Sequence, residues 1–281
     1  LKYLKENNVD LYPIIEILGD FIEQNIQYII FETMDIDLYK FYIKLRISFK
    51  NIIDIFYKVS LALDYIHSLN IIHTDLKPEN IMLKFNPDID YDDLNVNPND
   101  HIISCKIIDF GSSKTDNDNY YFYIQSRYYR APEVLYQIPY NKSIDVWSLG
   151  CIIYELLVSK PLFRGKNEIE MLYKITYYLG CPINLENYKK TKKFKNLFRN
   201  NIISKKVYYK YNECYNLEDY ELKLDNENLV LKFNKLFKFY KSEDKIVLIN
   251  LIDLLKNIIV YDTQQRFTAN QIVKDILFKN K

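Results

Sequence analysis

Two short stretches of the chain hold residue types that suit the transfer of a phosphoryl group. One stretch reads HTDLKPEN and begins at His73, and the other reads IIDFG further along the chain. Asp75 can orient an attacking hydroxyl and accept its proton, and Lys77 can neutralise the moving phosphoryl group. Asn80 and Asp109 offer hard oxygen ligands of the kind that magnesium prefers. Together these residues indicate a reaction in which a hydroxyl attacks a nucleotide phosphate that Mg²⁺ holds.

Apolar segments flank both stretches and must position them. Residues 49–68 carry apolar side chains at helical spacing, which predicts a helix with one buried face directly before the first stretch. The runs 81–83 and 105–108 predict two short strands around a polar loop over residues 86–100. Earlier in the chain, residues 14–18 and 27–32 predict two further strands, joined by a polar turn.

Three later helices have recognisable ends. Ser143 is expected to cap a helix that runs to about Ser159, and Asn167 to cap a helix that ends at Gly180. Thr268 forms a capping box with the glutamine three residues on. Strands that come first and helices that follow indicate an α+β fold with a small and a large lobe.

Composition excludes several classes of protein. The 38 Lys and Arg nearly balance the 37 Asp and Glu, so charge favours neither a nucleic acid nor an anionic membrane as partner. The longest apolar run, residues 149–158, is too short to span a bilayer. The four cysteines are scattered and form no C-x-x-C pair. They are expected to be buried thiols in a reducing compartment, so we expect the protein in the cytoplasm or nucleus. We also expect a monomer.

Further motifs resemble those of the eukaryotic protein kinases from the first residues to about Phe278. The chain reads APE at 131–133 and DVWSLG at 145–150, and Arg266 stands where that family has a late arginine. The resemblance implies a kinase-like fold, with residues 1–34 as part of the small lobe and 35–281 as the large lobe. Loop inserts are expected at 86–100 and an irregular insert at 183–245.

The resemblance also implies roles for individual residues. ATP and Mg²⁺ would be the cofactors and proteins the substrates, with Asp75 and Lys77 as catalytic residues and Asn80 and Asp109 as metal ligands. The adenine would be bound by Phe31 as gatekeeper, by the backbone of Glu32 and Met34, and by Met82 beneath it. The supporting residues would be His73, Phe110, Asp145 and the ion pair of Glu133 with Arg266.

The segment 121–133, YFYIQSRYYRAPE, together with GSS after Phe110, resembles the dual-specificity tyrosine-regulated kinases of the CMGC group. That resemblance implies regulation at the pair Tyr121 and Tyr123, with autophosphorylation on Tyr123 and later action on Ser/Thr. Arg127 and Arg130 would bind the phosphate. Thr74 departs from the family, which usually has cysteine there, and most kinases have an arginine that clamps a phosphate.

Other kinase features have no match in this sequence. It holds no glycine-rich loop, no strand lysine for the nucleotide and no helix glutamate to pair with that lysine. Residues 1–5 are expected to end the helix that carries the glutamate. Two hypotheses follow: part of an active kinase whose amino-terminal segment lies outside this sequence, or a non-catalytic scaffold that acts through the large lobe. We expect these 281 residues alone to be inactive.

Overall fold

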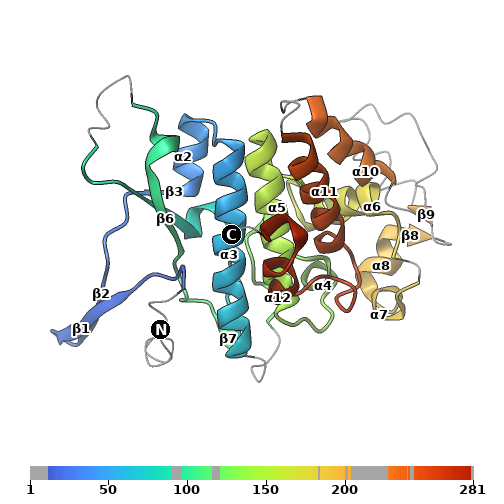
Figure 1. Ribbon diagram of the computed structural model, residues 1–281. Coiled ribbons are helices and arrows are strands. Elements are labelled where there is room, and N and C mark those ends of the chain that lie inside the picture. The colour runs from blue at the N-terminus through green and yellow to red at the C-terminus, as the bar shows by residue number, and fades with distance from the viewer. Residues whose placement is uncertain are drawn as a thin grey trace.

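The computed structural model places most of its strands toward one end of the molecule and most of its helices over the rest (Figure 1). The predicted helix end at residues 1–5 lies outside the described part of the chain. The structure describes residues 12–89, 96–115, 121–182, 184–199, 202–203, 227–238, 240 and 244–279.

A two-stranded hairpin projects from this end of the molecule (Figure 1). Strand β1 (Ile17–Glu23) pairs antiparallel with β2 (Ile26–Phe31), and Gln24 and Asn25 turn the chain with φ of 49° and 61°. The strand expected at 14–18 therefore begins later than predicted. Its first residues instead extend the pairing of another sheet, since Ile15 N donates to Ile107 O over 3.0 Å.

Two small sheets hold the residues around the HTDLKPEN stretch. Strand β5 (Ile81–Phe85) lies between β3 (Ile36–Asp37) and β6 (Ile102–Ile107), all antiparallel. The second sheet pairs β4 (Ile71–Ile72) with β7 (Lys114–Thr115). The β5 and β6 strands appear where the apolar runs predicted them, and the connection between them contains a short 3-10 helix, η3 (Pro98–His101).

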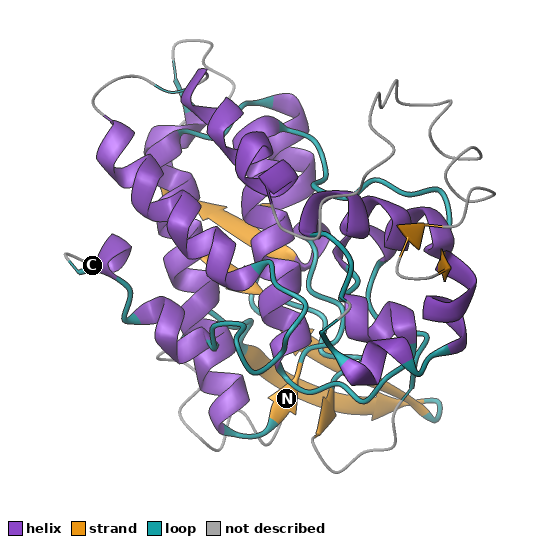
Figure 2. Cartoon of the chain, turned by 90° about the vertical axis from the view of Figure 1, so that its right-hand side faces the viewer, coloured by secondary structure: helices purple, strands orange, loops and turns teal. Residues whose placement is uncertain are grey.

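Helix α5 (Ser143–Val158) lies at the centre of the helical part, and its side chains are buried on almost every side. Helix α3 (Phe49–Ser68) packs beside it, with bounds that confirm the prediction from apolar spacing. Figure 1 shows α11 (Lys245–Ile258) on the other side of α5 from α3, and α12 (Ala269–Val273) packs against α3. Figure 2 shows helices over much of the face seen from that side. A helix that is apolar on every face fits only where other elements surround it.

Helix ends agree with the predicted caps in two of three cases. Asn167 caps α6 (Glu168–Leu179) by accepting from Glu170 N over 2.9 Å, and Thr268 forms its capping box before α12. Ser143 is not a cap, because it is the first residue of α5 and its own N–H donates to Asn141 Oδ1 over 2.9 Å. The asparagine two residues earlier provides the oxygen that was expected from the serine.

The stretch 183–245 contains more regular structure than its weak periodicity predicted. Its short helices are one to two turns long, too short for a period to be evident in the sequence. Tyr188, Phe194 and Phe233 from this stretch are buried in the core. The elements there are α7 (Glu186–Lys189), α8 (Lys192–Leu197), β8 (Phe198–Arg199), β9 (Ile202–Ile203), α10 (Glu227–Asn234) and η5 (Lys235–Lys238).

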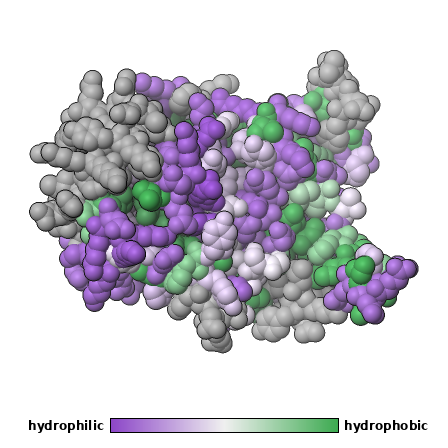
Figure 3. Space-filling view, turned by 180° about the vertical axis from the view of Figure 1, so that it is seen from behind, coloured by the Kyte–Doolittle hydropathy of each residue, from purple (hydrophilic) through white to green (hydrophobic). Residues whose placement is uncertain are grey.

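Apolar side chains of the β1–β2 hairpin are exposed on both of its faces. Ile22 is 72% exposed and Ile26 55% exposed, and Figure 3 shows apolar surface at this end of the molecule. A two-stranded ribbon of this kind has little core of its own to stabilise it. Among the described residues, no helix is long and apolar enough to cross a membrane.

Replacing Gly150 with alanine should destabilise the fold, because the added Cβ would lie 2.6 Å from Ile258 Cγ2 and 2.8 Å from Ile259 Cδ1. Overpacking of this kind costs about 1–3 kcal/mol, against ~1 kcal/mol gained from the better helix propensity of alanine. Thermal unfolding measures the change. Gly19→Ala is the matched control, because its Cβ would meet no atom within 4 Å; equal unfolding temperatures for both variants would contradict the tight packing of α5.

Candidate active site

Asp75 lies in the loop between β4 and the 3-10 helix η2 (Pro78–Asn80), and its two carboxylate oxygens have different partners. Oδ2 accepts from Lys77 Nζ over 2.7 Å, so the structure brings the two predicted catalytic residues together. Oδ1 accepts from Ser126, over 3.0 Å from the backbone N and 2.8 Å from Oγ. Ser126 was missed in the sequence, where a serine in a loop carries no distinguishing signal.

The two predicted metal ligands lie just outside the ends of two paired strands. Asn80 directly precedes β5 and Asp109 follows β6, and Asn80 O accepts from Ile108 N over 2.9 Å. The Asn80 amide nitrogen donates to Asp75 O over 2.9 Å, which leaves the amide oxygen as its metal-binding end. Asp109 is exposed, with φ of 62°. These oxygen donors fit magnesium, which uses one or two protein ligands together with water and phosphate oxygens.

Magnesium would need such outside ligands here. Among the described residues, no three His, Cys, Asp or Glu side chains come close enough to form a metal site by themselves. A site built from one amide and one carboxylate is therefore incomplete until a nucleotide supplies its phosphate oxygens.

Asp145 supports the loop from below at the start of α5. Its buried carboxylate accepts from His73 N over 2.8 Å and Thr74 N over 3.0 Å, and it also contacts His67 Nε2 at 3.0 Å. The His73 ring in turn contacts Ile108 O through Nε2 at 2.9 Å and packs edge-on against Phe110. The His73 ring therefore lies between the backbone that follows β6 and the Phe110 ring.

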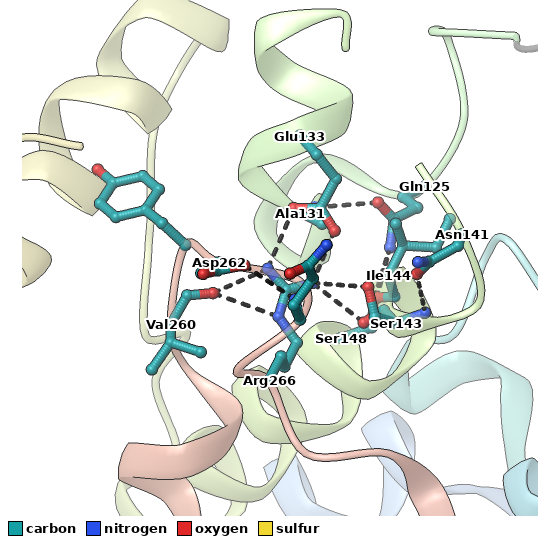
Figure 4. A network of polar contacts seen from close by, with 12 residues as sticks. Gln125, Ala131, Glu133, Asn141, Ser143, Ile144, Ser148, Val260, Asp262 and Arg266 are labelled. Atoms are coloured by element: carbon teal, nitrogen blue, oxygen red, sulfur yellow. Dashed lines mark hydrogen bonds and ion pairs between the residues drawn. The ribbon is translucent and has the colours of Figure 1, made fainter. Parts of the chain in front are cut away.

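Arg266 and Glu133 form a fully buried ion pair that joins three parts of the chain (Figure 4). Nη1 lies 2.6 Å from Oε1 and Nη2 lies 3.1 Å from Oε2, the parallel geometry of a guanidinium–carboxylate pair. Arg266 also donates to the carbonyls of Val260 and Ser143 and covers the Trp147 ring at 5.1 Å. The pair fixes α4 (Pro132–Tyr136) against α5.

Gln125 is a second buried anchor that sequence reasoning missed (Figure 4). Its amide nitrogen donates to Ser148 Oγ over 2.8 Å and to Ile144 O over 3.0 Å, and its side-chain oxygen accepts from Ala131 N over 2.9 Å. Its φ is 61°, a left-handed conformation. The segment before α4 is therefore held to α5 by side-chain hydrogen bonds, which no sequence period reveals.

The residues expected around adenine lie at the end of β2, in the connection to β3, and on β5. Met82 stands opposite Lys106 in the β5–β6 pairing, and the Lys106 amine forms a short ion pair with Glu32. Glu32 also accepts from Glu16 N over 2.8 Å, which fixes the end of the hairpin. Phe31 ends β2 and is half-exposed, and Met34 follows it before β3. Lys106 was missed, although its position opposite Met82 could have indicated it.

The tyrosine pair lies on the surface beside basic residues. Tyr123 is 87% exposed, and the Arg130 guanidinium lies 5.2 Å from its ring centre. Arg130 also donates to Gln125 O and pairs with Glu168 at 2.9 Å, whereas Arg127, in the short helix η4 (Arg127–Tyr129), donates to Lys166 O. Tyr121 N donates to the hydroxyl of Tyr140. The structure therefore brings Arg130, but not Arg127, to the ring of Tyr123.

Glu155 is a buried carboxylate that joins α2 (Leu38–Lys44) to η4, and sequence reasoning did not single it out. It accepts from the hydroxyls of Tyr42, in a short hydrogen bond, and of Tyr129 over 2.7 Å. Burial raises the pKa of Glu155, and the two hydroxyl donors oppose that shift. Since α5 is buried on almost every side, the spacing of its residues does not show which donors Glu155 meets.

Replacing Glu133 with glutamine should strongly destabilise the fold, because the Arg266 charge would stay buried without a counter-charge. Breaking one side of a buried pair costs about 3–5 kcal/mol. Urea unfolding measures this loss. Glu186→Gln is the control, since its partner Lys189 and Glu186 itself are exposed and the unfolding midpoint should hardly move. A Glu133→Gln protein as stable as the wild type would contradict the role given to this pair.

Comparison with known proteins agrees with this geometry. The protein kinase domain family matches residues 2–278. Human dual specificity tyrosine-phosphorylation-regulated kinase 3 is 37% identical over 197 residues, which are 68% of this chain and 31% of that protein. The dual specificity tyrosine-phosphorylation-regulated kinase mbk-2 of Caenorhabditis elegans is 37% identical over 200 residues, which are 69% of this chain and 23% of that protein.

A third relative is more similar over a shorter length. The "Probable dual specificity protein kinase YAK1 homolog" of Encephalitozoon cuniculi is 50% identical over 112 residues, 40% of this chain and 24% of that protein. The chain matches only about a fifth to a third of the length of these curated relatives. These relatives confirm the resemblance to the dual-specificity tyrosine-regulated kinases, and the chain belongs to the protein kinase family.

Proposed function

We propose that the protein transfers the γ-phosphoryl group of ATP to serine and threonine hydroxyls of protein substrates. The arrangement around Asp75 carries this proposal. One carboxylate oxygen is held by Ser126 and the other by Lys77, so the carboxylate has a fixed orientation at the centre of the loop. A hydroxyl that enters beside it can donate its proton to the carboxylate while a phosphoryl group moves toward the hydroxyl oxygen.

Lys77 and the metal ligands account for the negative charge of the phosphate. The Lys77 amine, which rests on Asp75, is close enough to balance charge on the moving group. Asn80 and Asp109 would hold magnesium, which neutralises the nucleotide phosphates when it is bound. Phe31, Glu32, Met34 and Met82 would contact the adenine. Protein substrates and an intracellular location, in cytoplasm or nucleus, belong to the same proposal.

Asp75→Asn should reduce phosphorylation of a serine peptide by about 10²–10⁴-fold, since the amide accepts no proton from the substrate hydroxyl. Transfer of labelled phosphate from ATP by the full-length protein measures this. Asp253→Asn serves as the control, because Asp253 is exposed and pairs only with Lys256 on the surface. Wild-type turnover by Asp75→Asn would remove Asp75 from the mechanism, and absence of turnover in the wild type would refute the kinase proposal.

We further propose that the protein phosphorylates its own Tyr123. The exposed ring beside Arg130 supports this, because a phosphate there would lie close to a guanidinium that is already fixed in place. Burial lowers the pKa of Arg130 and the nearby Glu168 carboxylate opposes that shift. A phosphate on Tyr123 would add a second negative partner for this arginine.

Mass spectrometry of the full-length protein produced in bacteria should find phosphate on Tyr123 in the wild type and none there in Asp75→Asn. The reason is that the protein's own catalytic carboxylate is needed for the transfer. Tyr123→Phe should lose this modification, whereas Tyr28→Phe, on the exposed hairpin, should keep it. Phosphate on Tyr123 in the Asp75→Asn protein would show that another kinase adds it.

A further inference from the structure

Thr74 adopts a backbone conformation that β-branched residues rarely take. Its φ is 68°, in the left-handed region, and its side chain is fully buried. For a threonine this conformation is a genuine outlier. Such residues persist only where the surrounding contacts hold them, and they concentrate at functional sites. The contacts of Thr74 therefore indicate what this strain maintains.

Each polar group of Thr74 has a different partner. Its N–H donates to Asp145 Oδ1 over 3.0 Å, beneath the loop. Its hydroxyl donates to Ser112 O over 2.7 Å, and its carbonyl accepts from Gln125 N over 3.0 Å. Ser112 lies three residues after the predicted metal ligand Asp109, and Gln125 directly precedes Ser126, which binds Asp75. One residue thus contacts both the start and the end of the segment that follows the metal ligand.

The contacts at the start of this segment form a regular series. Alternate residues from Ile108 to Lys114 each touch the loop or the strand before it. Ile108 bonds to Asn80 and contacts His73, Phe110 packs on His73, and Lys114 pairs with Ile72 in the β4–β7 sheet. Ser112 is the remaining member, and its carbonyl is held by the Thr74 hydroxyl.

Hydrogen bonds of Gln125 hold the end of the segment. Gln125 O accepts from Arg130 Nη2 over 2.8 Å, and the Gln125 side chain bonds to Ser148 and Ile144. Arg130 therefore holds the backbone at Gln125 directly.

We propose that Thr74 is a positioning residue that orders both ends of the 109–126 segment for phosphoryl transfer, in place of the arginine–phosphate clamp that most kinases use. Its hydroxyl fixes the end that carries Asp109, and its carbonyl fixes the end that carries Ser126. The proposal rests on the kinase function proposed above. Only the hydroxyl contact depends on the residue type, so the side chain can be tested separately from the backbone.

Three variants separate the hydroxyl from the shape of the side chain. Thr74→Val keeps the branched shape and loses the hydroxyl, Thr74→Ser keeps the hydroxyl and loses the methyl group, and Thr74→Ala is a second hydroxyl-free variant in case valine prevents folding. Hydrogen exchange at residues 111–115 of the full-length protein, without nucleotide, measures how firmly the start of the segment is held. Exchange in α5 reports any global loss of stability.

Losing one hydrogen bond should raise exchange at 111–115 on the order of fivefold in the valine and alanine variants, with α5 unchanged. Both variants should also phosphorylate a serine peptide more slowly than the wild type, and Thr74→Ser should match the wild type in both measurements. Wild-type exchange at 111–115 in Thr74→Val, or a serine variant that behaves like valine, would overturn the proposal. If the wild type itself transfers no phosphate, the kinase function fails, and the exchange data alone decide whether Thr74 holds the segment.

Discussion

The buried carboxylate of Asp145 at the start of α5 is the contact on which the arrangement of the site depends. It accepts the backbone N–H groups of His73 and Thr74 and contacts His67, so one side chain of the central helix fixes two successive peptide units of the loop. A carboxylate that is fully buried is tolerated only when hydrogen bonds satisfy it, and here three donors surround it. Because other elements pack around α5, the hydrogen bonds of Asp145 hold the loop in a fixed position. Asp75 directly follows Thr74, the second residue bonded in this way.

Two other buried groups connect later parts of the chain to the same helix. The side-chain amide of Gln125 links the backbone before η4 to α5. Arg266 links α4 to the start of α5, because it binds Glu133 of α4 and the Ser143 carbonyl of α5. The polar contacts of Asp145, Gln125 and Arg266 thus all involve the first turns of the same helix, and Figure 4 shows those of Gln125 and Arg266. Such networks are costly when incomplete and rigid when every member is paired, which suits a site that must hold several loops in register.

Much of this could be predicted because the relevant signals are local. The spacing of apolar residues predicted both ends of α3 correctly. The caps at Asn167 and Thr268 predicted where α6 and α12 begin. The residues predicted to be catalytic or to bind metal stand in short motifs. Gln125, Ser126 and Glu155 escaped prediction because each has a partner 19 to 113 residues away, and a polar residue does not show in sequence which distant group it will meet. Ser143 was predicted as the residue that caps α5, but it is the first residue of that helix. Its N–H donates to the side-chain oxygen of Asn141, two residues earlier.

Two contacts at its base attach the β1–β2 hairpin to the rest of the molecule. At that base, Ile15 N donates to Ile107 O, and Glu32 forms an ion pair with Lys106. The strands beyond it expose apolar side chains on both faces. A ribbon with so little core can open without loss of the helical part, because the two draw on separate sets of buried contacts. The placement of Glu32 and Met34, the two residues predicted to present backbone groups to adenine, can therefore vary between related sequences while the melting temperature of the helical part stays the same.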